Sequence, residues 1–107
     1  MHQGIYKVGA IILNDKKELL VVQKHYKDRT DYIIPGGKQE KGENDQQTLL
    51  RELQEELAIN VAAYEYFGEF EEVAIFENIP IVMSVYRVKI EGEPQARSEI
   101  KDLLASL

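Results

Sequence analysis

The segment from Glu43 to Leu57 has the periodicity of a helix, whereas the apolar runs on both sides of it have the character of strands. Within this segment, one apolar stripe recurs at spacings of three and four and is formed by Leu49, Leu50, Leu53 and Leu57. Strands before and after one central helix do not form a regular βαβ alternation. They predict an α+β fold in which a mixed sheet is packed by helices.

The strand-like runs can be placed by their Ile and Val content and by the turns that bound them. Residues 4–14 and 19–24 flank the polar turn NDKKE, which predicts a hairpin. Residues 25–31 read as a charged loop, and residues 32–37 as a short strand that Pro35 ends before a glycine pair. Residues 61–76 and 79–90 predict two further strands, and residues 96–107 are compatible with a short helix or a strand.

Length and charge restrict the classes of function. The 107 residues predict a single domain over 1–107, and the net charge of −6 argues against a nucleic acid polymer or an anionic membrane as partner. The absence of cysteine excludes disulfides, thiolate metal sites and a cysteine nucleophile. No signal-like start or long apolar stretch is present, so a cytoplasmic protein is expected.

Three glutamates crowd one face of the predicted helix. Glu52 lies three and four positions before Glu55 and Glu56, a spacing at which like charges repel by a few tenths of a kcal/mol. A solvated surface helix is one explanation of such a cluster. The other is a hard divalent cation with oxygen ligands, because its binding turns the repulsion into attraction. The upstream glycine pair and Glu43 favour the cation.

These residues resemble the box of the Nudix hydrolases, written G-x5-E-x7-R-E-U-x-E-E-x-G-U with U an aliphatic residue. From Gly37 through Glu43 to Ile59, every position of this 23-residue pattern matches except the late glycine, which is Ala58 here. The resemblance implies the Nudix fold, a mixed sheet sandwiched by helices. It also implies cleavage of a nucleoside diphosphate linked to another moiety, with Mg²⁺ or Mn²⁺ as cofactor and water as the nucleophile.

The resemblance also implies roles for individual residues. The metal ligands would be Glu52, Glu55 and Glu56, together with the backbone carbonyl of Gly36. Arg51 and Glu43 would be a pair that orients these glutamates, as groups next to metal ligands commonly do.

The general base differs between members of the family. In MutT-type members it follows a stretch similar to residues 91–94, and Glu99 is the nearest match here, offset by about one residue. An exposed structural role for Glu99 is an equal alternative, and Glu71, Glu72 and Glu77 are rivals for the base.

Two departures from the family pattern affect the expectations. The family glycine ends the helix in a left-handed conformation that costs another residue about 1 kcal/mol, so we expect Asn60 to end the helix slightly later. The final helix that usually packs on the sheet has no clear counterpart, so it is missing or short. A small natural member, a truncated chain and a homodimer that covers the apolar sheet remain alternatives.

Several functions are compatible with this reading. The favoured one is MutT-like hydrolysis of a small nucleotide, with nucleoside triphosphates preferred. The first alternative is a Nudix module that binds a nucleotide without cleaving it. The second is a structural calcium site, but the loop before the helix lacks the spacing of ligands that calcium needs.

Overall fold

A computed structural model of the protein describes residues 4–26, 29–74, 79–94 and 102–106, with side chains at 4–23, 32–71 and 79–94. Within these ranges the chain forms one helix and seven strands: β1 (Ile5–Ile11), β2 (Leu19–Tyr26), β3 (Arg29–Ile33), β4 (Gly36–Lys38), α1 (Asp45–Leu57), β5 (Asn60–Ala74), β6 (Ile79–Glu91) and β7 (Asp102–Ser106). The last 12 residues therefore contribute a strand, which the sequence had left open.

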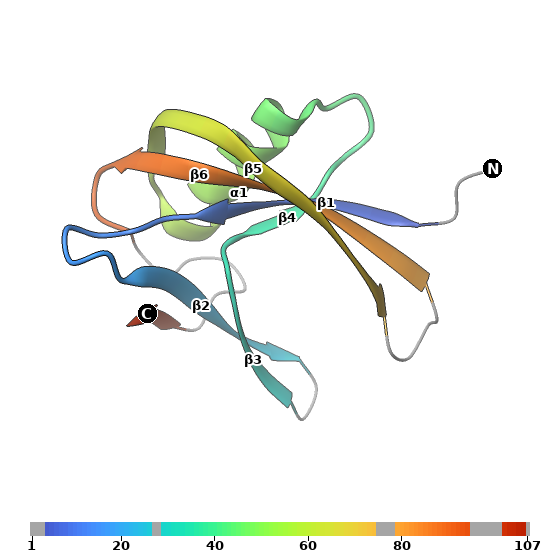
Figure 1. Cartoon of the computed structure of the whole chain (residues 1–107), viewed down its shortest axis with the longest axis horizontal. Coiled ribbons are helices and arrows are strands. Elements are labelled where there is room, and N and C mark those ends of the chain that lie inside the picture. Colours follow the sequence, from blue (N-terminus) through green and yellow to red (C-terminus); the bar gives the residue numbers. More distant parts are fainter. Residues whose placement is uncertain (1–3, 27–28, 75–78, 95–101, 107) are drawn as a thin grey trace.

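The strands form two sheets that lie at an angle to each other (Figure 1). The larger has the order β4-β1-β6-β5, and the smaller has the order β3-β2-β7. β1 and β6 are parallel and the other pairs are antiparallel, so the larger sheet is mixed. The α+β class and the mixed sheet are thus confirmed, and the helical part is the single helix α1 in the described residues.

The predicted hairpin between residues 4–14 and 19–24 is found only at its turn, and its extension into a pair of neighbouring strands is wrong. Next to the turn, an isolated antiparallel bridge joins Leu13 and Leu19, the Asn14 N–H donates to the Glu18 carbonyl, and the Leu20 N–H donates to the Ile12 carbonyl. Beyond it, β1 and β2 belong to different sheets. Both edges of β1 are already occupied by β4 and β6, so β2 has no edge to pair with.

The charged loop predicted at residues 25–31 is also wrong, because β2 continues to Tyr26 and β3 begins at Arg29. These two strands pair in register as a tight antiparallel hairpin. The glycine pair differs from the expectation as well. Gly36 and Gly37 belong to the short strand β4, which pairs with β1 directly after Pro35.

Helix α1 has well-defined ends. Asn44 caps its start, where its side chain accepts from the Gln47 N–H at 2.8 Å and the Gln47 side chain accepts from the Asn44 N–H at 2.9 Å. This reciprocal capping box satisfies two donors that the helix leaves unpaired. At the other end Ala58 itself adopts the left-handed conformation (φ 57°, ψ 39°), and its N–H donates to the Gln54 carbonyl. The expectation that Asn60 ends the helix is wrong, since Asn60 begins β5.

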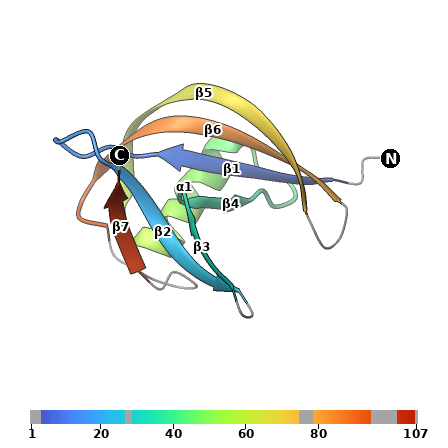
Figure 2. The same ribbon diagram turned by 60° about the horizontal axis from the view of Figure 1, so that its bottom comes forward.

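The core lies between α1 and one face of the larger sheet, as Figure 2 shows. Leu49, Leu53 and Leu57 are fully buried against the inward residues of β1, among them Val8 and Ala10. Leu50 belongs to the predicted stripe but is 39% exposed, because a position adjacent to Leu49 is rotated by about 100° around the helix axis.

The opposite face of the larger sheet exposes large apolar side chains. Phe67 and Phe70 of β5 are 46% and 52% exposed, and their rings stack with centroids 6.3 Å apart. A cavity of about 540 Å³ lies on this face and reaches Ile34 and Met83. In the residues that the structure describes, no helix covers this face.

Candidate active site

The predicted glutamate face and the glycine strand meet at one cavity. It has a volume of about 310 Å³ and is bordered by Glu52, Glu55 and Glu56 from α1 and by Gly36–Lys38 from β4. The leucines of α1 anchor the helix in the core, so its glutamates are presented toward the short edge strand. The tertiary structure thereby gathers all four predicted ligand residues around one cavity.

The position of the Glu52 carboxylate depends on the absence of a side chain at Gly37. A Cβ atom at this position would overlap the Glu52 carboxylate. The φ angle of Gly37 lies outside the left-handed region, so close approach is the reason that this position suits glycine.

Glu56 is 6% exposed, and its Oε1 accepts a hydrogen bond of 3.1 Å from the Gly36 N–H. Gly36 has a φ of 141°, and a Cβ atom there would overlap the backbone of Val8. Glycine is therefore required for β4 to lie against β1, and this pairing directs the Gly36 N–H toward Glu56.

Arg51 connects the helix, the preceding loop and β4. Its Nε and Nη2 donate to the two oxygens of Glu43 at 2.6 and 2.9 Å, its Nη1 donates to Glu52 at 2.5 Å, and its Nη2 donates to the Lys38 carbonyl at 3.0 Å. Two parallel bonds to one carboxylate give the pair a defined geometry. The structure therefore places Arg51 where it orients Glu52.

The electrostatics of this group follow from the same contacts. The hydrogen bond from Arg51, followed by that from the Glu40 N–H, lowers the pKa of Glu43 from 4.5 to about 2. The bond to Glu43 raises the pKa of Arg51 in turn, with a further contribution from Glu52. Both groups are held in their charged forms.

Glu55 is more exposed, with 55% of its side chain accessible, and lies 3.5 Å from Arg51. Among the residues that the structure describes, no three histidine, aspartate or glutamate side chains are gathered as a metal site. Glu52 is turned toward Arg51, and Glu56 toward the Gly36 N–H. The residues nonetheless fit a hard divalent ion, because three glutamates and the glycine strand border one cavity and Gly37 leaves room for the Glu52 carboxylate.

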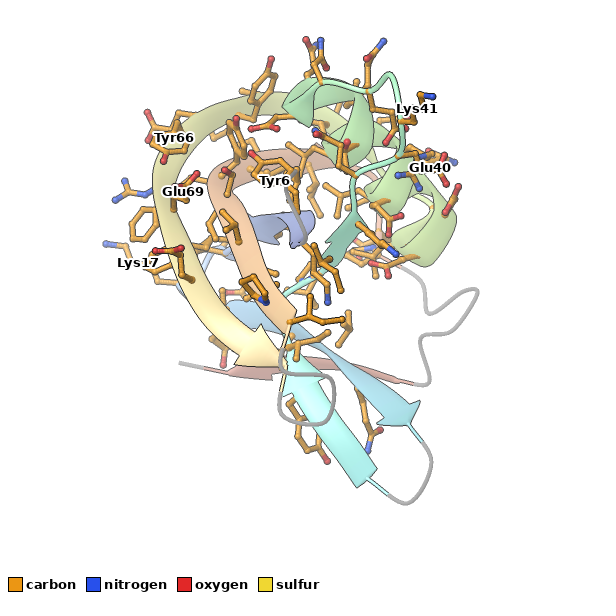
Figure 3. The ribbon with its side chains drawn as sticks, turned by 90° about the vertical axis from the view of Figure 1, so that its right-hand side faces the viewer. Tyr6, Lys17, Glu40, Lys41, Tyr66 and Glu69 are labelled. Carbon is orange, nitrogen blue, oxygen red and sulfur yellow. The ribbon has the colours of Figure 1, made fainter. Side chains whose placement is uncertain are left out.

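A group that the sequence analysis did not identify holds the start of α1. Asp45 accepts from the Tyr6 hydroxyl at 3.0 Å and from the Tyr86 hydroxyl at 2.6 Å, and Tyr6 also contacts Ser84 at 2.6 Å. In Figure 3 Tyr6 lies between β5, which carries Tyr66 and Glu69, and the loop with Glu40 and Lys41. The partners of Asp45 are 39 and 41 positions away along the chain, too far to be recognised from spacing.

Of the candidates for the general base, only Glu71 has a described side chain, and it does not border this cavity. Glu99 lies outside the described residues, as do Glu77 and the side chain of Glu72. Glu71 is exposed on β5 and borders the larger apolar cavity instead.

Two lysines at the cavity were also missed. Lys7 and Lys38 border it from β1 and β4. The available signals were that Lys38 directly follows the glycine pair and that Lys7 is the only charged residue between Gly4 and Leu13.

Comparison with protein families agrees with this geometry. The NUDIX domain family model matches residues 5–106. The chain belongs to the Nudix family. Family membership supports a pyrophosphohydrolase role, which is hydrolysis of a phosphorus-containing anhydride, and Nudix hydrolases generally use divalent metal ions. No curated protein matches the sequence at a significant level.

Solved structures extend the comparison to three dimensions. The Escherichia coli ORF135 protein is 30% identical with a TM-score of 0.83, over 98% of this Nudix chain and 74% of its own. The MutT Nudix hydrolase from Burkholderia pseudomallei shares the fold at 23% identity with a TM-score of 0.87, over 98% of this chain and 84% of its own. The mutator MutT protein from Bacillus halodurans is 26% identical with a TM-score of 0.77, over 95% and 67%.

Within the described part of this Nudix protein, no helix has the length and apolar character needed to cross a bilayer.

Proposed function

We propose that this Nudix protein hydrolyses the pyrophosphate bond of a nucleoside diphosphate linked to another moiety, with nucleoside triphosphates as the preferred class and Mg²⁺ or Mn²⁺ as cofactor. The observation that carries the proposal is the cavity of about 310 Å³ in which Glu52, Glu55 and Glu56 face the glycine strand. A surface helix would present its carboxylates to bulk water, whereas these border a cleft and Glu56 is buried.

The roles follow from the contacts of each residue. Glu52 and Glu56, with Glu55 and the Gly36 carbonyl, would hold the divalent ion. When bound, this ion neutralises charge that builds on phosphoryl oxygens and makes water more acidic. Arg51, held by Glu43, keeps the Glu52 carboxylate beside Gly37 and so positions it.

The reaction is an in-line displacement at phosphorus. The oxygen of a water molecule forms a bond to one phosphorus atom, and the bond from that phosphorus to the bridging oxygen breaks. The bridging oxygen leaves with the second phosphate, and the proton of the water passes to a carboxylate. We propose Glu99 as this base by resemblance, and Glu52 and Glu56 are carboxylates that border the cavity.

The test is hydrolysis of a panel of nucleoside triphosphates, nucleoside diphosphate sugars and dinucleoside polyphosphates with Mg²⁺. Wild type should release phosphate or pyrophosphate, and Glu56→Gln and Glu52→Gln should lose roughly 100-fold or more in kcat. Glu91→Gln, at an exposed position at the end of β6, is the matched control and should retain activity. Products formed in ¹⁸O-labelled water identify the phosphorus that is attacked.

Other results would separate the alternatives. Activity that survives Glu56→Gln contradicts the proposed site. Tight nucleotide binding by wild type without hydrolysis of any compound supports the non-catalytic nucleotide-binding module instead.

We further propose that residues 1–107 act as one domain in the cytoplasm and that no nucleic acid polymer is a partner. We also propose that a homodimer covers the exposed sheet face. The exposed Phe67 and Phe70 support the last of these. Size-exclusion chromatography with light scattering tests it directly.

A further inference from the structure

Two lysines face the glutamate cavity from the side of the sheet. Lys7 of β1 and Lys38 of β4 are direct partners in the antiparallel ladder. Both border the cavity that contains Glu52, Glu55 and Glu56. Side chains that are directly opposite in an antiparallel pair have Cβ atoms about 5 Å apart, and like charges there are destabilising. The fold therefore places two lysine side chains directly opposite each other, at some cost in stability.

This cost is not offset by neighbouring carboxylates. In the part of the chain with described side chains, no ion pair within 4.0 Å involves Lys7 or Lys38. Glu52 is paired with Arg51 instead. The two lysines thus keep their positive charge available at the cavity, although acidic groups line its other side.

Packing does not explain Lys7 either. It is the only charged residue in the run from Gly4 to Leu13, and it is half-buried. Lys89 of β6 lies on the same face of the sheet, since Lys7 is in register with Met83 and residues 83 and 89 share a face. Lys89 is exposed and borders different cavities, so it serves as a reference surface lysine against which the half-buried Lys7 can be compared.

We propose that Lys7 and Lys38 form a phosphate-binding site next to the glutamates, which receives the phosphate of the substrate that lies beyond the cleaved bond. This inference rests on the proposed hydrolase function and deepens it. A chain of phosphates that meets the glutamates through a divalent ion still has negative charge on its next phosphate. Compact ammonium groups suit such a group as point charges. The lysine pair therefore favours compounds with three linked phosphates over those with two.

The first experiment measures binding of inorganic tripolyphosphate and of pyrophosphate by calorimetry in the presence of Mg²⁺. A charge-assisted hydrogen bond is worth enough to change affinity roughly tenfold, so Lys7→Met should weaken tripolyphosphate binding about tenfold and the double variant with Lys38→Met more. Pyrophosphate binding should change less than about threefold, because fewer of its oxygens reach the pair. Lys89→Met should change neither.

Two controls separate loss of the site from loss of the fold. Lys7→Arg keeps the charge and should restore tripolyphosphate binding to within about threefold. The methionine variants should melt at the same temperature as wild type or higher, because they remove a repulsion between neighbours.

A kinetic experiment tests the same site by comparing the KM of a nucleoside triphosphate with the KM of a nucleoside diphosphate sugar. The KM of the triphosphate should rise about tenfold in Lys7→Met while kcat is largely kept. If wild type and the double variant bind tripolyphosphate equally, the lysine site is refuted, even where wild type is an active hydrolase. If wild type hydrolyses nothing on the panel, the proposed function fails instead, whatever the lysines bind.

Discussion

The hydroxyl of Tyr86 lies 2.6 Å from Oδ2 of Asp45 and donates a hydrogen bond to it, which joins β6 to the first turn of α1. The two residues are 41 positions apart. Because Glu52 and Glu56 follow on the same helix, this bond and the one from Tyr6 to Asp45 set the position from which the glutamates reach β4. The site is thus held at its far end by groups that do not line the cavity.

Tyr86→Phe should lower the free energy of unfolding by about 1 kcal/mol, because the hydrogen bond is lost while the ring is kept. Burial, followed by the bond to Asp45, raises the pKa of Tyr86. A raised pKa in the folded state means that the unfolded chain loses this proton first, so the stability that it provides is complete below about pH 10 and falls at higher pH.

Urea unfolding at stepwise pH measures both effects. The decline above about pH 10 should be shallower in Tyr86→Phe than in wild type. Tyr66→Phe is the matched control, because Tyr66 is 59% exposed on the neighbouring strand. Equal stability of wild type and Tyr86→Phe would show that the bond contributes nothing to anchoring α1.

Ala58→Gly should stabilise the protein by about 1 kcal/mol, since Ala58 ends the helix in a left-handed conformation that glycine adopts without a Cβ clash. Thermal unfolding should shift upward by roughly 4 °C. Ala63→Gly, in the extended strand β5, should have the opposite sign because glycine weakens a strand. A lower melting temperature in Ala58→Gly would contradict the strain at this position.

Glu43→Gln should remove part of the acid sensitivity of the fold. The pKa of Glu43 is lowered to about 2, so its stabilising contribution is complete above about pH 5 and is lost as the pH falls toward 2. The free energy of unfolding of the variant should therefore depend less on pH between these values, as measured by denaturant titration. Glu91→Gln should keep the wild-type dependence, and an unchanged slope in Glu43→Gln would argue against the ion pair with Arg51.

Gly37→Ala and Gly36→Ala should fail in different ways. At Gly37 the atoms nearest to the added Cβ are those at the end of the flexible Glu52 side chain, so the carboxylate should move and the fold should survive. Displacement of about 1 Å at a reacting site costs roughly 100-fold in rate, and we expect a loss of this size at a nearly unchanged melting temperature.

At Gly36 the added Cβ meets the backbone of Val8, and φ is 141°. The variant should lose about 1–3 kcal/mol of stability or fail to fold. Circular dichroism melting beside the hydrolysis assay distinguishes the two variants. Similar melting temperatures for both would show that β4 tolerates a side chain at either position.

The local parts of the site were predictable because they depend on spacing along one helix and its flanking loop. The positions of Glu52, Glu55 and Glu56 at helical intervals, and Arg51 eight residues after Glu43, are properties of the chain that a regular helix makes visible. The core leucines followed from the same period, with Leu50 as the exception, since periodicity does not show where an apolar stripe meets solvent.

The tertiary structure alone decided which distant groups meet these parts. The pairing of β1 with β4 and β6 separated it from β2, brought Lys7 opposite Lys38, and directed the Gly36 N–H to Glu56. The same arrangement brought Tyr86 to Asp45. Such contacts depend on which strand edges pair, and edge pairing is set by competition across the whole chain, so no local period records it.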